Sequence, residues 1–387
     1  MIFKYFENVI WIFFLVYACV FQVFGENMYL QSLNLIILFL FYFFNTLIMG
    51  KTQTVMATRG FVGFCSLVFI SIISSLLSEN VLHSLAMVVL YIIFIFSIRE
   101  ANMRGIKVWL PEILKGYSFV TLSFIVLMIA LNDFDLTTRF AYIRSPNSMA
   151  LILLSLLPGF GFTNPKFRPF LYATVATIAL ILQSRNGIIG VAIYFLIAQL
   201  VLSQSMRFGK LAYTFSLIVG VSLILTFWSS ISDLLLLGDD YRGSDTNFSG
   251  RVFAWLHSLK IIQENVVFGV GIGNSHLYFH HVTGTAGASG YNYLLTGTHN
   301  GYLKVFVDFG VPAALMIFWF TVRGLSGIIN QKSTWSAPLV GFSAAYLFFC
   351  IFEESLFGLG NPSSLIFLMI TLVGLSRSFS EIEGLKV

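Results

Sequence analysis

Long runs of apolar residues alternate with short polar segments along most of the chain. A helix needs roughly 20 consecutive apolar residues to cross the hydrocarbon core of a bilayer. By this criterion the sequence predicts about twelve membrane-spanning helices, at residues 9–24, 29–49, 60–77, 81–98, 117–131, 147–162, 170–183, 187–204, 211–230, 299–322, 336–352 and 362–378. The pattern predicts an all-α polytopic membrane protein, with residues 1–387 in a single integral membrane domain.

The composition supports this class. Hydrophobic residues make up 57% of the chain and charged residues 10%, and the mean hydropathy is +0.87, which excludes a soluble globular protein. The first apolar segment has no small-residue cleavage site, so we expect it to be an uncleaved anchor. Cys19, Cys65 and Cys350 all lie in predicted spans, which argues against a disulfide framework or a thiolate metal site in the outer loops.

Lysine and arginine gather on one side of the predicted helices. Short cytoplasmic loops accumulate these residues. If the N-terminus is cytoplasmic, the inner segments hold 15 of the 22 basic residues: Lys4, Lys51, Arg59, Arg99, Arg104, Lys107, Lys115, Lys166, Arg168, Arg207, Lys210, Arg323, Lys332, Arg377 and Lys386. This bias predicts that both termini are cytoplasmic. It also accounts for the net charge of +5 without a nucleic-acid partner.

Two predicted outer segments are longer than the other loops, at residues 132–147 and about 231–298. Long loops in compact proteins are usually functional. Within the larger loop, residues 249–265 alternate apolar and charged positions at helical spacing, which predicts an amphipathic helix lying on the membrane surface or on the helix bundle. The run "GVGIGN" that follows is expected to form turns rather than a dinucleotide site. The Gly- and Thr-rich residues after it are expected to form a mobile strap.

Two arginines lie at the predicted outer face. Arg185 stands in "LQSRNG" between two apolar runs, and Arg251 lies at the start of the amphipathic helix. A guanidinium group is always charged and can bind phosphate oxygens in a bidentate way, so two of them near a helix N-terminus would suit a diphosphate. The alternatives are that Arg185 extends to the lipid headgroups and that Arg251 is a solvated surface residue.

The segment "THNGYLKVFVDFG", residues 298–310, places ionisable side chains in a predicted span, where they are costly unless paired or functional. Lys304 and Asp308 are four residues apart and can form an ion pair inside the bundle. His299, predicted to open the helix and to share a face with Tyr302, could act as a general base at the outer mouth. The alternative is a helix-capping or interface histidine.

Two adjacent carboxylates, Glu353 and Glu354, lie at a predicted outer helix end. They could help to orient either substrate of an enzyme at that face. Adjacent carboxylates at a helix end are more often simply solvated, and this alternative stays open.

Two groups of residues could suggest a metal site. The first group is His276 and His280, four residues apart as on one face of a helix, followed by His281. The flanking Gly and Thr residues disfavour a helix, and no carboxylate completes a set of metal ligands. Asp133 and Asp135 could hold a divalent ion on a sugar diphosphate, although loop aspartates are usually solvated. We therefore predict no metal ion, and the roles of both groups stay open.

Four segments resemble the O-antigen ligase and O-antigen polymerase superfamily: "SPNSMALILLSLLP", "LQSRNGIIGVAIYFL", "SGRVFAWLHSLKIIQENVVFGVGIGN" and "THNGYLKVFVDFGV". The resemblance covers about residues 145–325. In the ligases a histidine is followed by Asn, Ser or Gln, nine residues, Gly, two residues, and Gly, Thr or Tyr. His299, Asn300 and Gly310 fit this pattern, whereas Ala313 departs from it in the last place.

The resemblance implies a GT-C-like membrane glycosyltransferase with one large periplasmic loop. Such an enzyme takes a glycan from undecaprenyl diphosphate and passes it to an acceptor sugar hydroxyl on the periplasmic side, without a metal, nucleotide or other cofactor. By the same resemblance, Arg185 and Arg251 match the family's diphosphate-binding arginines and His299 its essential histidine. We expect supporting roles for the remaining candidates: Tyr302, Lys304, Asp308 and Glu353.

Three functions follow, in order of preference. The first is a polymerase of O-antigen or capsule repeat units, and the second is a ligase that transfers the finished glycan to lipid A core. The third, a secondary transporter or flippase, would place ionisable residues near the bilayer midplane on broken helices, whereas the candidates here gather at the outer face. For the enzymes, the expected location is the bacterial inner membrane. The expected partners are an undecaprenyl-diphosphate-linked oligosaccharide, an acceptor glycan, the lipid bilayer and, as further candidates, a chain-length regulator or a flippase.

Overall fold

Helices dominate the computed structural model. It describes residues 2–24, 36–37, 40, 58–102, 106–131, 146–181, 185–202, 246–279, 283–286, 291–294, 297–330, 335–359 and 361–382. The α-helices are α1 (Ile2–Phe24), α3 (Thr58–Leu76), α4 (Val81–Asn102), α5 (Ile106–Leu131), α6 (Pro146–Gly161), α7 (Arg168–Ile181), α8 (Arg185–Leu202), α11 (Thr246–Glu264), α12 (Gly301–Ile329), α13 (Ser336–Phe349) and α14 (Pro362–Ile382). A short 3-10 helix, η3 (Ser275–Tyr278), and two strands, β1 (Thr283–Ala286) and β2 (Tyr291–Leu294), complete the described elements.

The predicted helical membrane architecture is confirmed. Described helices occupy ten of the twelve predicted spans, while the spans at 29–49 and 211–230 fall almost entirely outside the described residues. Within the described part, three helices are long and apolar enough to cross a membrane, at Val81–Ala101, Trp109–Met128 and Gly301–Ile329, and six further apolar helices are shorter. The total of twelve spans therefore stays a prediction.

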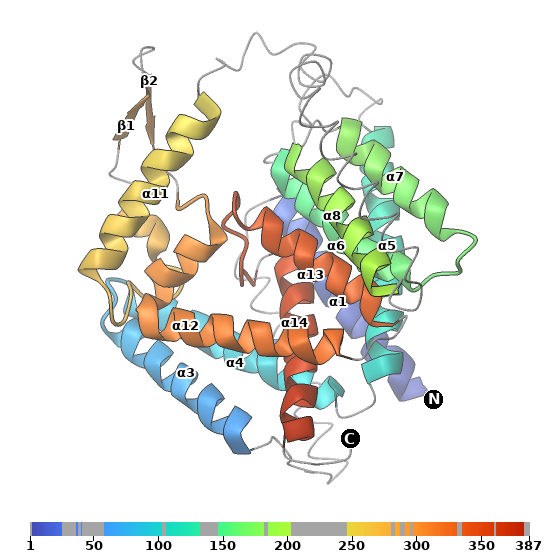
Figure 1. Ribbon diagram of the computed structural model, residues 1–387, viewed down its shortest axis with the longest axis horizontal. Helices are drawn as coiled ribbons and strands as arrows, with labels where there is room; N and C mark the ends of the chain where they lie inside the picture. Colours follow the sequence, from blue (N-terminus) through green and yellow to red (C-terminus); the bar gives the residue numbers. More distant parts are fainter. Residues whose placement is uncertain are drawn as a thin grey trace.

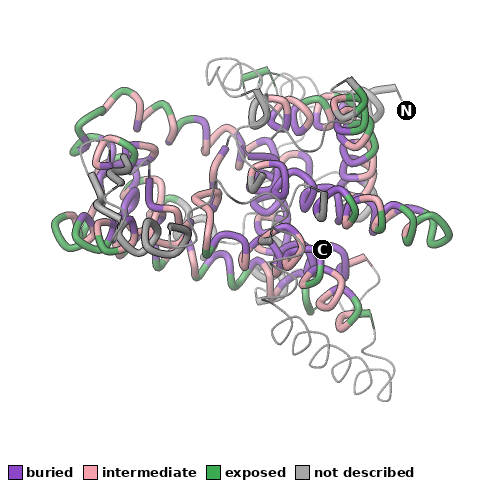
Figure 2. Tube along the Cα trace, turned by 90° about the horizontal axis from the view of Figure 1, so that it is seen from above, coloured by how far each residue is buried: buried purple, intermediate pink, exposed green. Residues whose placement is uncertain are grey.

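The core lies around α6 and α14. Residues 149–161 of α6 are all buried, and α6 packs against α5, α7, α8, α13 and α14. Figure 1 shows α3 and α11 on one side of the molecule and α5 and α7 on the other, with α13 and α14 between them. In Figure 2 the buried residues gather along the helices in the middle of the molecule. This arrangement places the long helix α12 between the core and α11.

Helix α12 is interrupted in its first half. Gly310 has φ 74° and ψ 172°, outside the helical region, and Pro312 lacks the N–H that would continue the helical hydrogen bonds. A Cβ atom on Gly310 would lie 2.5 Å from the Val267 carbonyl oxygen, so the segment after α11 leaves room only for glycine. Three backbone hydrogen bonds join this segment to α12: from Val311 N to Val266 O (2.8 Å), from Val270 N to Val307 O (2.9 Å) and from Gly271 N to Asp308 O (3.1 Å).

The interruption changes the interpretation of the ionisable residues in α12. Residues 311–329 alone are about 28 Å long at 1.5 Å per residue, close to the thickness of the hydrocarbon core. Lys304 and Asp308 both precede the break, outside this apolar part of the helix. The predicted span over residues 299–322 lies almost entirely within the apolar helix Gly301–Ile329, which Gly310 and Pro312 divide into two parts.

The predicted amphipathic helix is present as α11, and it packs against α12. Ala254 and Ile261 of α11 are buried in a cluster with Val307 of α12, whereas Leu256 and Lys260 are exposed. Of the two placements that the sequence left open, the structure therefore shows α11 on the helix bundle. The strap that follows contains a two-stranded antiparallel hairpin, with Thr283 of β1 opposite Leu294 of β2.

Candidate functional site

His299 lies just before α12, in a left-handed backbone conformation with φ 47°. Among the described residues other than glycine, only His299 and Phe357 have positive φ. Such conformations cost of order 1–3 kcal/mol and cluster at functional sites. The helix itself begins at Gly301, two residues after His299, so the prediction that His299 opens the helix is wrong.

Asn300 sets this helix start. Its side-chain oxygen accepts hydrogen bonds from Tyr302 N (2.9 Å) and Leu303 N (3.0 Å), which satisfies two of the N–H groups that have no partner within the helix. Its Nδ2 donates to Ile351 O at 3.0 Å, and Gly301 N donates to Cys350 O at 2.8 Å. The N-terminus of α12 is thereby attached to the turn after α13.

The backbone of His299 is held from two sides. Its N–H donates to Glu354 Oε1 at 3.3 Å, and its carbonyl oxygen accepts from Trp255 Nε1 of α11 at 3.5 Å. Gly297 packs tightly on the Glu354 carboxylate, since an added Cβ atom would lie 1.9 Å from Oε1. Helix α11, the start of α12 and the turn after α13 therefore meet at His299.

The contacts made by Trp255 and Glu354 were not predicted from the sequence. By sequence, Trp255 is one of the apolar positions of the predicted amphipathic helix at residues 249–265. Glu353, rather than Glu354, was placed among the expected site residues, because adjacent carboxylates at a helix end are indistinguishable by pattern. In the structure the Glu354 carboxylate accepts a hydrogen bond from the His299 N–H. The Glu353 carbonyl oxygen instead lies beside Gly301, and a Cβ atom added to Gly301 would be 3.1 Å from it.

Tyr302 lies in the first turn of α12, whereas His299 precedes the helix. The Tyr302 hydroxyl donates to Leu347 O of α13 at 2.7 Å, and its ring lies 6.0 Å from that of Phe318. Tyr302 therefore supports the packing of α12 on α13.

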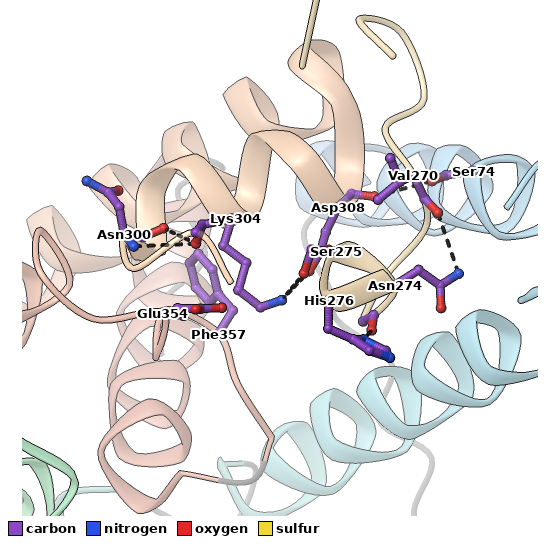
Figure 3. A network of polar contacts seen from close by, with 12 residues as sticks. Ser74, Val270, Asn274, Ser275, His276, Asn300, Lys304, Asp308, Glu354 and Phe357 are labelled. Atoms are coloured by element: carbon purple, nitrogen blue, oxygen red, sulfur yellow. Dashed lines mark hydrogen bonds and ion pairs between the residues drawn. The ribbon is translucent and has the colours of Figure 1, made fainter. Parts of the chain in front are cut away.

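Lys304 and Asp308 form the predicted ion pair, with Lys304 Nζ and Asp308 Oδ2 at 3.0 Å. Lys304 Nζ also donates to Ser275 Oγ of η3 at 2.7 Å (Figure 3). The Asp308 side chain is 5% exposed, and its Oδ1 has no hydrogen-bond partner among the described residues. The pair thus joins a buried carboxylate to a segment outside α12.

Arg251 lies in the second turn of α11, and its side chain is outside the described part of the structure. It precedes Trp255 by four residues, and positions four apart lie on the same side of a helix. Because Trp255 contacts His299, the Arg251 position lies on the side of α11 that faces the start of α12.

Arg185 is the first residue of α8, and its side chain is likewise outside the described part. Helix α8 packs against α13, and the two helices run in opposite directions. A Cβ atom added at Gly190, near the start of α8, would lie 3.8 Å from Phe349 at the end of α13. A Cβ atom added at Gly341, in the first half of α13, would lie 2.8 Å from Tyr194 O, further along α8. The start of α8 therefore lies at the end of α13 to which the N-terminus of α12 is attached. Arg185 therefore lies towards the same end of α13 as the N-terminus of α12.

The described residues contain no group of three or more His, Cys, Asp or Glu side chains that could hold a metal ion. His276 lies in η3, only four residues long, and its Nδ1 contacts Gly273 O at 2.8 Å. His280, His281, Asp133 and Asp135 lie outside the described residues. The predicted glycine turns are confirmed by positive φ at three positions: Gly269 (66°), Gly271 (93°) and Gly273 (79°).

Comparison with known families gives a match over the part of the chain that contains these positions. A family model described as O-antigen ligase matches residues 170–318. This match supports the similarity of residues 170–318 to the O-antigen polymerase and ligase superfamily. The matched segment contains Arg185, Arg251 and His299, so the family resemblance seen in the sequence is confirmed. Among curated proteins, no match to the chain was found.

The match to the O-antigen polymerase and ligase superfamily narrows the class of function. Its members are glycosyltransferase-type enzymes of lipopolysaccharide or polysaccharide biosynthesis, which act on lipid-linked glycans in a membrane. The transporter alternative receives no support from the match.

Proposed function

We propose that the protein is a polymerase of O-antigen or capsule repeat units. It takes the growing glycan from undecaprenyl diphosphate and transfers it to a sugar hydroxyl of the next lipid-linked unit, on the periplasmic face of the bacterial inner membrane. The observation that carries the proposal is His299, which lies within the matched family segment at the meeting point of α11, α12 and the turn after α13.

In the proposed reaction His299 is the general base. It accepts the proton of the acceptor hydroxyl while that oxygen bonds to the anomeric carbon of the donor sugar, and the bond from this carbon to the diphosphate breaks. Negative charge then develops on the leaving diphosphate, where the guanidinium groups of Arg185 and Arg251 stabilise it. These roles require no metal ion or nucleotide.

The proposed topology is a GT-C-like arrangement of about twelve spans, with both termini cytoplasmic and residues 231–298 in the periplasm. Its support is the distribution of basic residues. Arg323 lies near the C-terminal end of α12, on the predicted inner side, whereas His299 precedes its N-terminal end. This orientation places the site of reaction at the periplasmic end of α12.

The ligase is the second candidate. Its support is the description of the matching family model and the fit of His299, Asn300 and Gly310 to the ligase pattern, although Ala313 departs from it. In the structure Gly310 is the residue at which α12 breaks. Polymerase and ligase share the donor and the mechanism, and they differ in the acceptor.

A complementation assay tests the proposal and separates the candidates. Wild type and His299→Ala are expressed in a strain that lacks the gene, and lipopolysaccharide is resolved on a gel. Loss of the ladder with core plus one repeat unit retained supports the polymerase, while loss of all O-antigen with accumulation of long lipid-linked chains supports the ligase. His276→Ala, at an exposed histidine, is the matched control and should give a normal ladder. A normal ladder from His299→Ala would refute the catalytic role.

A further inference from the structure

Lys304 contacts more than its ion-pair partner. Its side chain is only 21% exposed, and Nζ lies 3.0 Å from Asp308 Oδ2 and 2.7 Å from Ser275 Oγ. It is also attracted by the Glu354 carboxylate. Figure 3 shows the Lys304 side chain extending between Glu354 on one side and Ser275 and Asp308 on the other. An ammonium group has three N–H donors, so it can serve several acceptors at once.

These contacts join segments that are distant in the sequence. Ser275 precedes Lys304 by 29 residues and belongs to η3, which follows α11. Glu354 belongs to the turn after α13. Lys304 itself lies one helical turn after Asn300, with its N–H donating to Asn300 O at 3.0 Å. The Lys304 ammonium group therefore joins α12 to η3, and its charge acts on the Glu354 carboxylate that accepts the His299 N–H.

Neutralisation of Asp308 alone would not require the hydrogen bond from Lys304 to Ser275 or the position of the Lys304 charge beside Glu354. A partly buried carboxylate such as Glu354 is costly unless a positive charge or hydrogen bonds compensate it. Lys304 supplies the charge, and the N–H of His299 supplies one hydrogen bond. Without Lys304, Glu354 would be free to turn towards solvent and would release the backbone of His299.

We propose that Lys304 is a positioning residue for His299. It acts through Glu354, whose carboxylate it keeps against the His299 N–H, and through Ser275, which keeps η3 beside α12. This inference rests on the proposed role of His299 as the general base, and it goes beyond that role because it names the group that keeps the base in place.

Two double variants separate positioning from simple charge pairing. Lys304→Met with Asp308→Asn removes both charges of the pair, so neither partner is left as a buried unpaired ion. Lys304→Asp with Asp308→Lys keeps an ion pair on the same side of α12 but moves the positive charge one helical turn away from Glu354. Folding is measured as membrane level and thermal unfolding in detergent. Activity is measured as the initial rate of transfer from lipid-linked repeat units in membrane vesicles.

The expected result is that a folded double variant loses transfer activity by about tenfold or more. The loss should appear in kcat, with less than about a twofold change in KM for the donor, because a positioning residue acts on the base and not on donor binding. Lys304→Arg keeps the charge near Glu354 and should retain activity within about threefold of wild type.

A folded double variant with wild-type activity would overturn the inference, because Lys304 would then serve only to pair with Asp308. Failure of both double variants to fold would also overturn it, since Lys304 would be required for the fold itself. Neither result affects the proposed function, which fails only if His299→Ala is active.

Discussion

The backbone N–H of His299 and the Oε1 atom of Glu354 form a hydrogen bond of 3.3 Å between residues 55 positions apart. This bond joins the residue before the cap of α12 to the turn after α13. It fixes a histidine whose backbone is in a left-handed conformation, which L-residues adopt at an energetic cost. Glu354 is thus a direct anchor of the proposed general base, as is Trp255 on the His299 carbonyl oxygen.

Removal of the Glu354 carboxylate should lower the transfer activity while the amount of protein in the membrane stays unchanged. In Glu354→Ala the His299 N–H loses its acceptor, and we expect the initial rate of transfer to fall about tenfold or more, because displacement of a base by 1 Å is sufficient for such a loss. Glu354→Gln keeps an oxygen acceptor and should retain more activity than the alanine variant. A wild-type rate for Glu354→Ala, at equal membrane level, would contradict this role.

Gly301 should not tolerate a side chain. An added Cβ atom would lie 2.7 Å from Leu356 Cβ and 3.1 Å from Glu353 O, so Gly301→Ala must push α12 away from the turn after α13. Overpacking of this kind costs about 1–3 kcal/mol, and we expect a lower midpoint of thermal unfolding in detergent. Gly358→Ala is the control, because its added Cβ would lie at an ordinary 3.5 Å from Ser355 O. Equal midpoints for the two variants would show that the close contact at Gly301 is absent.

Asn300 should contribute to stability in two separable ways. Asn300→Ala removes both the helix cap and the hydrogen bond to Ile351 O, whereas Asn300→Ser can keep the cap alone. Loss of an N-cap costs about 1 kcal/mol, so the expected order of unfolding midpoints is wild type, then serine, then alanine. An alanine variant as stable as wild type would show that α12 does not depend on this cap.

The two outer arginines should require the guanidinium group and not only its charge. Lysine cannot bind diphosphate oxygens in a bidentate way, so Arg185→Lys and Arg251→Lys should each reduce the ladder in the complementation assay. Arg323→Lys is the control, since Arg323 is exposed near the other end of α12, 5.7 Å from the ring of Trp319. A full ladder from both outer variants would refute diphosphate binding by these arginines.

Several features could be predicted from the sequence because they depend on local patterns. The lengths of the apolar runs predicted the helices that the structure describes, and the spacing of four predicted the pair of Lys304 and Asp308. The glycines of "GVGIGN" predicted turns, since glycine readily adopts positive φ. Four short segments, in their order along the chain, also sufficed to indicate the superfamily that residues 170–318 match.

Other features depended on contacts between distant segments. Gly310 and Pro312 lie in an apolar run that looks continuous, and the break in α12 is stabilised by hydrogen bonds from residues 266–271. The choice of Glu354 over Glu353, and the position of His299 outside the helix, both follow from the packing of α12 on the turn after α13. No local pattern specifies these contacts, because their partners are far apart along the chain and become neighbours only when the helices pack.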